Sequence, residues 1–171
     1  MGKNHQMKVF KFGGASVKDA AAIRNLAGII TASGPPLVIV VSAFGKTTNA
    51  LEQVVNARHG GEADALSLLK DVYTLHVSVA RELGLEDEEL YDCLQDTYQV
   101  AGEYLSEREE PDYDMDYDQL VSAGEMWSSR IIASWLKKEG HNCQWVDIRK
   151  VLLTDKRFRD ANILWPESES R

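Results

Sequence analysis

The sequence predicts an α/β fold with a mostly parallel sheet, because its hydrophobic patterns run in the order strand, helix, strand, helices, strand. Residues 8–12 alternate polar and apolar side chains, as does a strand with one covered face. Residues 37–41 form the continuous run Leu-Val-Ile-Val-Val, which is typical of a parallel strand covered on both faces. A third, short strand is predicted at residues 142–146.

The helices are predicted from apolar side chains at helical spacing. The first follows Gly13-Gly14, with Ser16 as its N-cap and Asp19 completing a capping box, and ends at residues 33–36. The second follows the loop 42–47 and is broken at Gly60-Gly61.

Two more helices are expected from residue 62 to about residue 106, divided near Gly84, and another over 119–138. The acid-rich stretch 107–118 is expected to be a solvated loop. Ligands of parallel sheets bind beyond the carboxyl ends of the strands. We therefore expect the loops that follow the three strands to meet at one site.

Composition limits the classes of protein that this chain can belong to. It has 171 residues, 44% hydrophobic and 27% charged, as expected of one globular domain. Its net charge of -8 and the lack of a basic patch argue against a nucleic-acid partner, and no apolar run is long enough for a membrane span or signal peptide. Two distant cysteines, Cys93 and Cys143, fit a reducing compartment, so a cytoplasmic location is expected.

The segment Lys11-Phe12-Gly13-Gly14-Ala15-Ser16 is the first candidate for chemistry. Two glycines after a strand allow close approach of the backbone to a ligand, and a following helix would direct its N–H groups to the same place. Lys11 adds a positive charge, and phosphoryl transfer needs such charge compensation. The alternative is a tight turn beside a surface lysine.

A second candidate loop runs from Ser42 to Asn49 and contains Gly45-Lys46-Thr47. It is not a Walker P-loop, because Val40 stands where that motif requires its first glycine. Its hydroxyl and amide groups are suited to holding a substrate carboxylate or hydroxyl.

Two further segments contain charged residues. Glu125, in residues 122–129, is placed near a helix start, where a carboxylate is favoured electrostatically, or it pairs with a substrate ammonium. The small residues around Glu125 would allow a substrate to approach it closely. Asp147-Ile148-Arg149-Lys150-Val151 follows the predicted third strand and is either part of a site or surface charge.

Together these segments resemble the aspartokinase family, within the amino-acid kinase superfamily. The opening segment resembles the family's K-F-G-G-T-S, and residues 42–49 resemble its second loop. Ser122-x-Gly124-Glu125-x-x-Ser128 is similar to S-x-G-E-x-x-S, and residues 147–151 are similar to D-x-R-K-V. The four motifs occur in the family's order, and the resemblance extends from about residue 8 to 158.

The resemblance implies a three-layer αβα sandwich and the ATP-dependent phosphorylation of the side-chain carboxylate of L-aspartate, with Mg²⁺ accompanying ATP. This reaction is the first step toward lysine, threonine and methionine. The implied site residues are Lys11 for catalysis, and Gly13, Gly14, Ser16, Ser42, Thr48 and Glu125 for binding substrate or phosphate. Lys11 would stabilise the transferring phosphoryl group, and Glu125 would bind the aspartate ammonium. No metal ligand is implied.

Two departures from the family qualify these expectations. Ala15 replaces the usual threonine. The family's catalytic domain continues well beyond residue 171 into an ATP-binding half, followed by ACT domains. Residues 7–171 are therefore expected to be the N-terminal portion of the catalytic domain, inactive alone and homo-oligomeric when complete, with 1–6 a flexible tail or cloning remnant. The alternatives are another amino-acid kinase, or a non-catalytic binding or dimerisation module of this fold.

Overall fold

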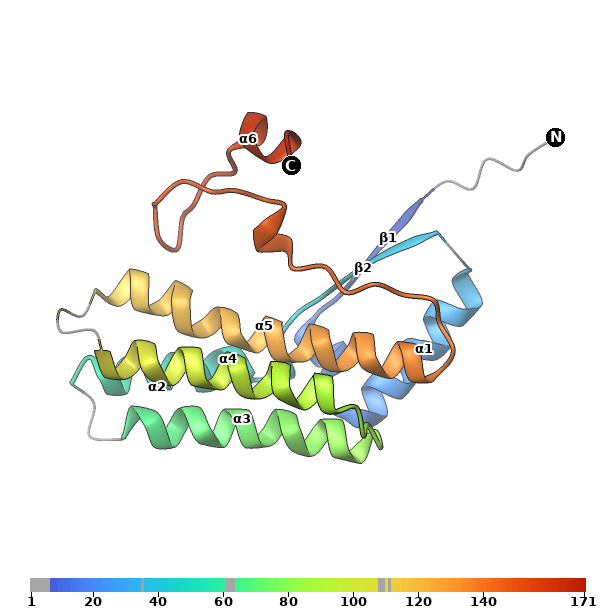
Figure 1. Ribbon diagram of the computed structural model, residues 1–171, viewed down its shortest axis with the longest axis horizontal. Helices are drawn as coiled ribbons and strands as arrows, with labels where there is room; N and C mark the ends of the chain where they lie inside the picture. Colours follow the sequence, from blue (N-terminus) through green and yellow to red (C-terminus); the bar gives the residue numbers. More distant parts are fainter. Residues whose placement is uncertain (1–6, 35, 61–63, 108–109, 111) are drawn as a thin grey trace.

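The structure is a computed structural model that describes residues 7–34, 36–60, 64–107, 110 and 112–171. Its elements, in order, are β1 (Lys8–Phe12), η1 (Gly14–Val17), α1 (Ala20–Ser33), β2 (Leu37–Val41), α2 (Thr47–Arg58), α3 (Ala65–Glu82), α4 (Glu88–Glu107), α5 (Tyr113–Lys138), η2 (Ile148–Lys150) and α6 (Trp165–Glu169). Helices α2 to α5 lie side by side, and the two strands and α1 lie at one end of them (Figure 1). The predicted tail 1–6 and Gly61 lie outside the described residues.

The strands β1 and β2 pair in parallel, from Lys8 opposite Leu37 to Phe12 opposite Val41, with α1 as the crossover. The predicted α/β fold with a parallel sheet is thus confirmed. One face of the sheet packs against the hydrophobic core. The other, which we call the open face, is exposed in the described chain and carries Val9, Lys11, Val38 and Val40. The prediction that both faces of β2 are covered is therefore wrong for this chain.

The predicted third strand is also wrong. Residues 142–146 are not assigned to a strand or helix. Side chains bond this segment to α5: the Trp145 Nε1 donates to Ser129 Oγ at 3.0 Å, and the Cys143 thiol donates to the Ala133 carbonyl at 3.5 Å. Within the part of the chain that the structure describes, the named sheet has two strands.

The start of α1 differs from the predicted capping box. Asp19 itself is the N-cap, and its carboxylate accepts a hydrogen bond from Ala22 N at 2.8 Å. Ser16 lies earlier, in the short 3₁₀ helix η1, where its N–H donates to the Gly13 carbonyl at 2.8 Å. The glycine turn thus leads first into η1, and the chain reaches α1 only afterwards.

Helices α2 to α5 form a closed ring in which each packs against the next, and α5 also packs against α2. At its centre Trp127 is fully buried and donates from Nε1 to the Leu94 carbonyl at 3.1 Å. His76 stacks on Phe44, with 5.1 Å between ring centroids, and lies 5.0 Å from Trp127. Burial lowers the pKa of His76 to about 4, so this imidazole is neutral near pH 7. Because Phe44 is buried and stacks on His76, it anchors the loop after β2 in the bundle core.

The acid-rich stretch is helical from Tyr113 onward, so its prediction as a solvated loop to residue 118 is wrong there. Asp116 is fully buried. Its carboxylate accepts hydrogen bonds from Tyr104 Oη at 2.6 Å and Arg58 Nε at 3.0 Å, and lies 2.9 Å from His59 Nε2. A carboxylate with partners on α2 and α4 joins three helices.

Burial by itself raises the pKa of Asp116, but hydrogen bonds from Tyr104, His59 and Arg58 outweigh burial and hold that pKa below its usual value. The network therefore stabilises the folded chain fully above the pKa of an unfolded aspartate. Its contribution is lost as the pH falls through the lowered pKa of the folded state.

No helix in the described part of the chain is long and apolar enough to cross a membrane.

Replacing Asp116 with Ala is expected to lower the free energy of unfolding by about 3–5 kcal/mol, because it leaves the Arg58 charge buried without its carboxylate. The measurement is urea denaturation followed by circular dichroism. The control is Asp160→Ala, which removes an exposed ion pair with Arg157 and should cost less than about 1 kcal/mol. Equal losses in the two variants would contradict a structural role for the Asp116 network.

Candidate functional site

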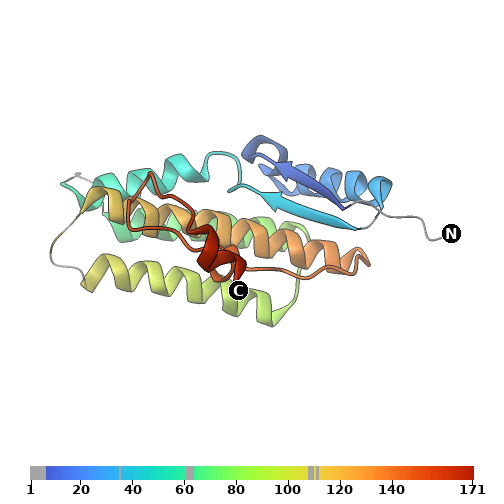
Figure 2. The ribbon, with the colours of Figure 1, turned by 90° about the horizontal axis from the view of Figure 1, so that it is seen from above.

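The loops after β1 and β2 contact each other at the carboxyl ends of the strands. Ser42 N donates to the Phe12 carbonyl at 3.0 Å, and Gly45 N donates to the Gly14 carbonyl at 3.1 Å. A Cβ on Gly14 would lie only 2.9 Å from the Gly45 carbonyl oxygen, so a side chain at this position would collide with the second loop. Both strand arrows end near the start of α2 (Figure 2). The predicted meeting of these two loops is confirmed.

Lys11 is exposed on the open face, one residue before the end of β1. Its ammonium lies beside the glycine turn, since a Cβ on Gly13 would be 3.8 Å from Lys11 Nζ. The sequence predicted that N–H groups at the start of the following helix would point at this turn. In the structure α1 starts later, and its Ala22 N–H already donates to the Asp19 carboxylate. Positive charge at the turn therefore comes from Lys11 rather than from the end of α1.

The third segment lies against the second loop. A Cβ on Gly124 would be 2.9 Å from Thr47 Cγ2 and 3.0 Å from Ala43 Cβ, so α5 approaches the loop as closely as a glycine permits. One turn later, Ser128 Oγ donates to the Ser42 carbonyl at 3.0 Å. The small residues around Glu125 thus allow α5 to pack closely on the second loop.

Glu125 lies in the middle of α5, so its placement near a helix start is wrong. Its side chain is half-buried. Burial raises the pKa of the Glu125 carboxyl, and hydrogen bonding with the backbone of Glu125 itself and of Ala43 opposes that rise only in part. A partly desolvated carboxylate beside the second loop is suited to pairing with a small cation such as an ammonium group.

Ser16 and Thr48 are two further predicted binding residues. Ser16 is exposed in η1, and Thr48 is half-buried in the first turn of α2. The adjacent Thr47 is the buried one, and its Oγ1 has no hydrogen-bond partner among the described residues. The sequence did not single out Thr47. The only signal was a second hydroxyl beside Thr48.

The fourth segment contributes an ion pair of its own. Arg149 donates from Nε and Nη2 to the two carboxylate oxygens of Asp147, at 2.9 and 2.8 Å. These hydrogen bonds lower the pKa of Asp147. No hydrogen bond or ion pair between described residues joins residues 147–151 to the loops after β1 and β2. The structure therefore assembles three of the four segments, and the expected meeting with the loop after Val146 is not found.

Comparison with known proteins identifies the class that this fold and site define. The sequence model of the Amino acid kinase family matches residues 6–164, and the chain belongs to that family. It is 34% identical over 164 residues to Aspartokinase 2, chloroplastic, of Arabidopsis thaliana, and 29% identical over 157 residues to Lysine-sensitive aspartokinase 3 of Escherichia coli. Each match covers 91% of this chain.

Solved structures show the same likeness. The structure of E. coli aspartokinase III in complex with aspartate and ADP matches 96% of this chain with a TM-score of 0.77 and 26% identity. Clostridium acetobutylicum aspartate kinase matches at a TM-score of 0.73 and 20% identity, which concerns the fold alone. The chain spans 29% of the Arabidopsis relative, 34% of the E. coli relative and 36% of the E. coli structure.

Replacing Gly124 with Ala is expected to destabilise the chain by about 1–3 kcal/mol, because the added methyl overlaps Thr47 and Ala43 across a packed contact. Thermal or urea unfolding measures the change. Gly28→Ala on α1 is the matched control: a Cβ there has no heavy atom within 4 Å, and its helix propensity should improve stability slightly. A Gly124→Ala protein as stable as Gly28→Ala would show that α5 does not depend on this close approach.

Proposed function

We propose that this chain is the N-terminal, aspartate-binding part of an aspartokinase, which transfers the γ-phosphoryl group of ATP to the side-chain carboxylate of L-aspartate. The observation that carries the proposal is the assembly of three segments at the ends of β1 and β2, with half-buried Glu125 beside Ala43. The aspartokinase names of the relatives support it, as does the aspartate and ADP complex of a structural neighbour.

In this proposal the binding groups are divided by charge. Glu125 pairs with the α-ammonium of aspartate, since it is a partly desolvated anion. Lys11 and the backbone N–H groups of Gly13 and Gly14 compensate the charge on the transferring phosphoryl oxygens. Ser42 in the loop after β2, Thr48 in the first turn of α2 and Ser16 in η1 supply polar contacts. The substrate carboxylate attacks directly, so no covalent intermediate with the protein is needed.

The nucleotide is expected to bind mainly to parts of a longer protein, because the relatives are about three times as long as this chain. Among the described residues, no group of three or more His, Cys, Asp or Glu side chains could hold a metal ion. Mg²⁺ is expected to accompany ATP and to bind its phosphates. The cytoplasmic location and the homo-oligomer stay predictions; several relatives are chloroplastic by name.

Replacing Lys11 with Ala is expected to reduce turnover by at least about 100-fold with little change in aspartate affinity, because Lys11 acts on charge that develops during transfer. The measurement is ATP- and aspartate-dependent ADP release by a completed enzyme, in which this chain precedes the remaining two thirds of an aspartokinase. Lys8→Ala, on the same strand, is the control and should leave turnover unchanged. A parallel loss of aspartate binding and turnover would contradict the assigned role.

The affinity of the chain for L-aspartate is expected to fall as the pH is lowered. The fall should begin at a higher pH than it would if Glu125 had the ordinary pKa of a glutamate. The raised pKa of Glu125 means that this carboxylate loses its charge, and its attraction for the ammonium, earlier in an acid titration. Isothermal titration calorimetry at several pH values measures the effect. Glu125→Gln should bind more weakly and without this pH dependence. If the dependence persists in Glu125→Gln, another group is responsible.

A further inference from the structure

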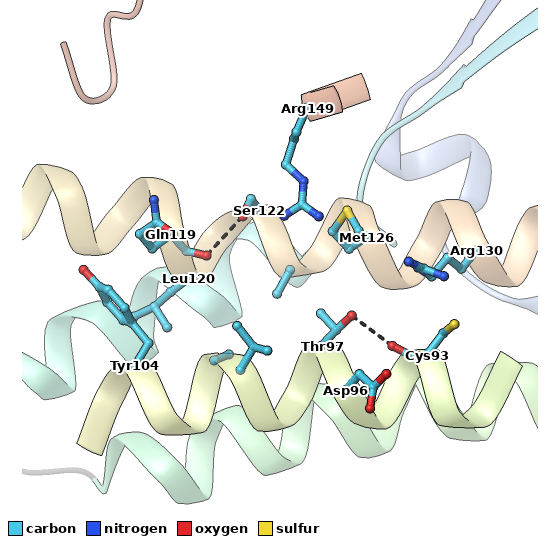
Figure 3. A pocket seen from close by; sticks show the side chains of 13 residues that line it. Cys93, Asp96, Thr97, Tyr104, Gln119, Leu120, Ser122, Met126, Arg130 and Arg149 are labelled. Carbon is cyan, nitrogen blue, oxygen red and sulfur yellow. Dashed lines mark hydrogen bonds between the residues drawn. The ribbon is translucent and has the colours of Figure 1, made fainter. Parts of the chain in front are cut away.

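A groove lies between α4 and α5. Its lining includes Ser122 and Arg149 of the third and fourth segments but none of the residues to which we assign a role in phosphoryl transfer or aspartate binding. We call it the α4–α5 groove. Its volume is ≈ 240 Å³, and it is lined by Cys93, Asp96, Thr97, Val100, Ala101, Tyr104, Gln119, Leu120, Ser122, Ala123, Met126, Arg130 and Arg149. Figure 3 shows side chains of both helices facing one another across it, with Arg149 reaching in from η2. Ligand pockets commonly measure about 300–1,000 Å³, so the groove suits a small ligand.

The charged residues of the lining differ in sign and number. Arg130 and Arg149 supply two guanidinium groups, and Asp96 is the single acidic residue in the lining. The lining also includes the apolar side chains of Val100, Leu120 and Met126. This arrangement favours an anion of low charge that also carries an apolar body.

Arg130 has an unsatisfied donor. Its guanidinium lies 3.9 Å from the centroid of the Trp145 ring. Its Nε is buried and has no hydrogen-bond partner, and the side chain makes no ion pair with any residue that the structure describes. A buried donor without a partner is unfavourable. Arg130 also lines the groove, so its guanidinium group can meet a ligand oxygen there.

Asp147 orients the Arg149 side chain but binds only part of its guanidinium group. Asp147 binds its Nε and Nη2, which leaves Nη1 without a hydrogen bond to the described residues. Figure 3 shows the guanidinium pointing from η2 toward Ser122 and Met126 on α5. Asp147 thus orients a second donor at the mouth of the groove, and a planar carboxylate is the anion that guanidinium groups match best.

We propose that the α4–α5 groove binds a small monocarboxylate with a short aliphatic body, its oxygens at Arg130 and Arg149 and its hydrocarbon between α4 and α5. The proposal does not depend on the kinase activity. A highly charged anion such as phosphate is disfavoured, because Asp96 lines the same groove and the apolar wall would be left unfilled.

The test uses the 171-residue chain and three probes: 4-methylpentanoate, the uncharged 4-methylpentan-1-ol with the same carbon skeleton, and inorganic sulfate. Binding is followed by amide chemical shifts in two-dimensional NMR. The carboxylate should shift amides of the groove, such as those of Thr97, Ser122 and Met126, in a saturable way. The alcohol and sulfate should bind at least about tenfold more weakly, since each lacks one of the two interactions.

Variants assign the binding to the arginines. Arg130→Gln and Arg149→Gln should each weaken 4-methylpentanoate binding about tenfold or more. The control is Arg24→Gln, which also removes an arginine over a tryptophan ring, 5.9 Å from Trp135, but not one that lines the groove. It should leave the affinity unchanged, as should Glu125→Gln, which separates this site from the proposed aspartate site.

Several results would overturn the proposal. They are the absence of saturable carboxylate binding, equal affinity for the alcohol, or shifts that map to residues 13–14 and 42–48 in place of the groove. Unchanged affinity in Arg149→Gln would do so as well. Arg149 is largely exposed, so this variant is expected to fold even if Arg130→Gln does not.

Discussion

The close approach of α5 to the loop after β2 is the constraint on which the candidate site depends. Gly124 leaves no room for a side chain, so the loop that carries Ser42 rests directly on the helix, and Ser128 bonds to it. The same helix carries Trp127 into the centre of the four-helix ring. The site is therefore built on a helix with many buried residues, which also packs against the loop after β2.

Much of this arrangement could be predicted from the sequence. The continuous apolar run at 37–41, the alternation at 8–12 and the helical spacing of residues 119–138 depend on local patterns, which the fold preserves. The site could be predicted to the extent that each segment follows a strand end or contains small residues. The position of Glu125 in mid-helix could not, because the helix starts at Tyr113 within a stretch whose composition resembles a loop.

Two of the failures share a physical cause: they were decided by contacts distant in sequence. Asp116 is buried because Arg58 and Tyr104 come from other helices, and acid-rich composition carries no sign of those partners. Residues 142–146 lie along α5 through the side chain of Trp145, whereas strand formation would require a neighbouring backbone. The groove depends likewise on Arg130, from α5, and Arg149, from η2, coming together.

Glu125 and the two loops are proposed to form an aspartate site. This proposal is tested most directly by titrating the chain with L-aspartate and, separately, with succinate, which has both carboxylates but no ammonium, while recording amide chemical shifts. Saturable shifts are expected at Gly14, Ala43 and Glu125 with L-aspartate. Succinate should bind at least about tenfold more weakly, because the charge-assisted contact with Glu125 is lost. Equal binding of the two, or shifts confined to other parts of the chain, would contradict the proposal.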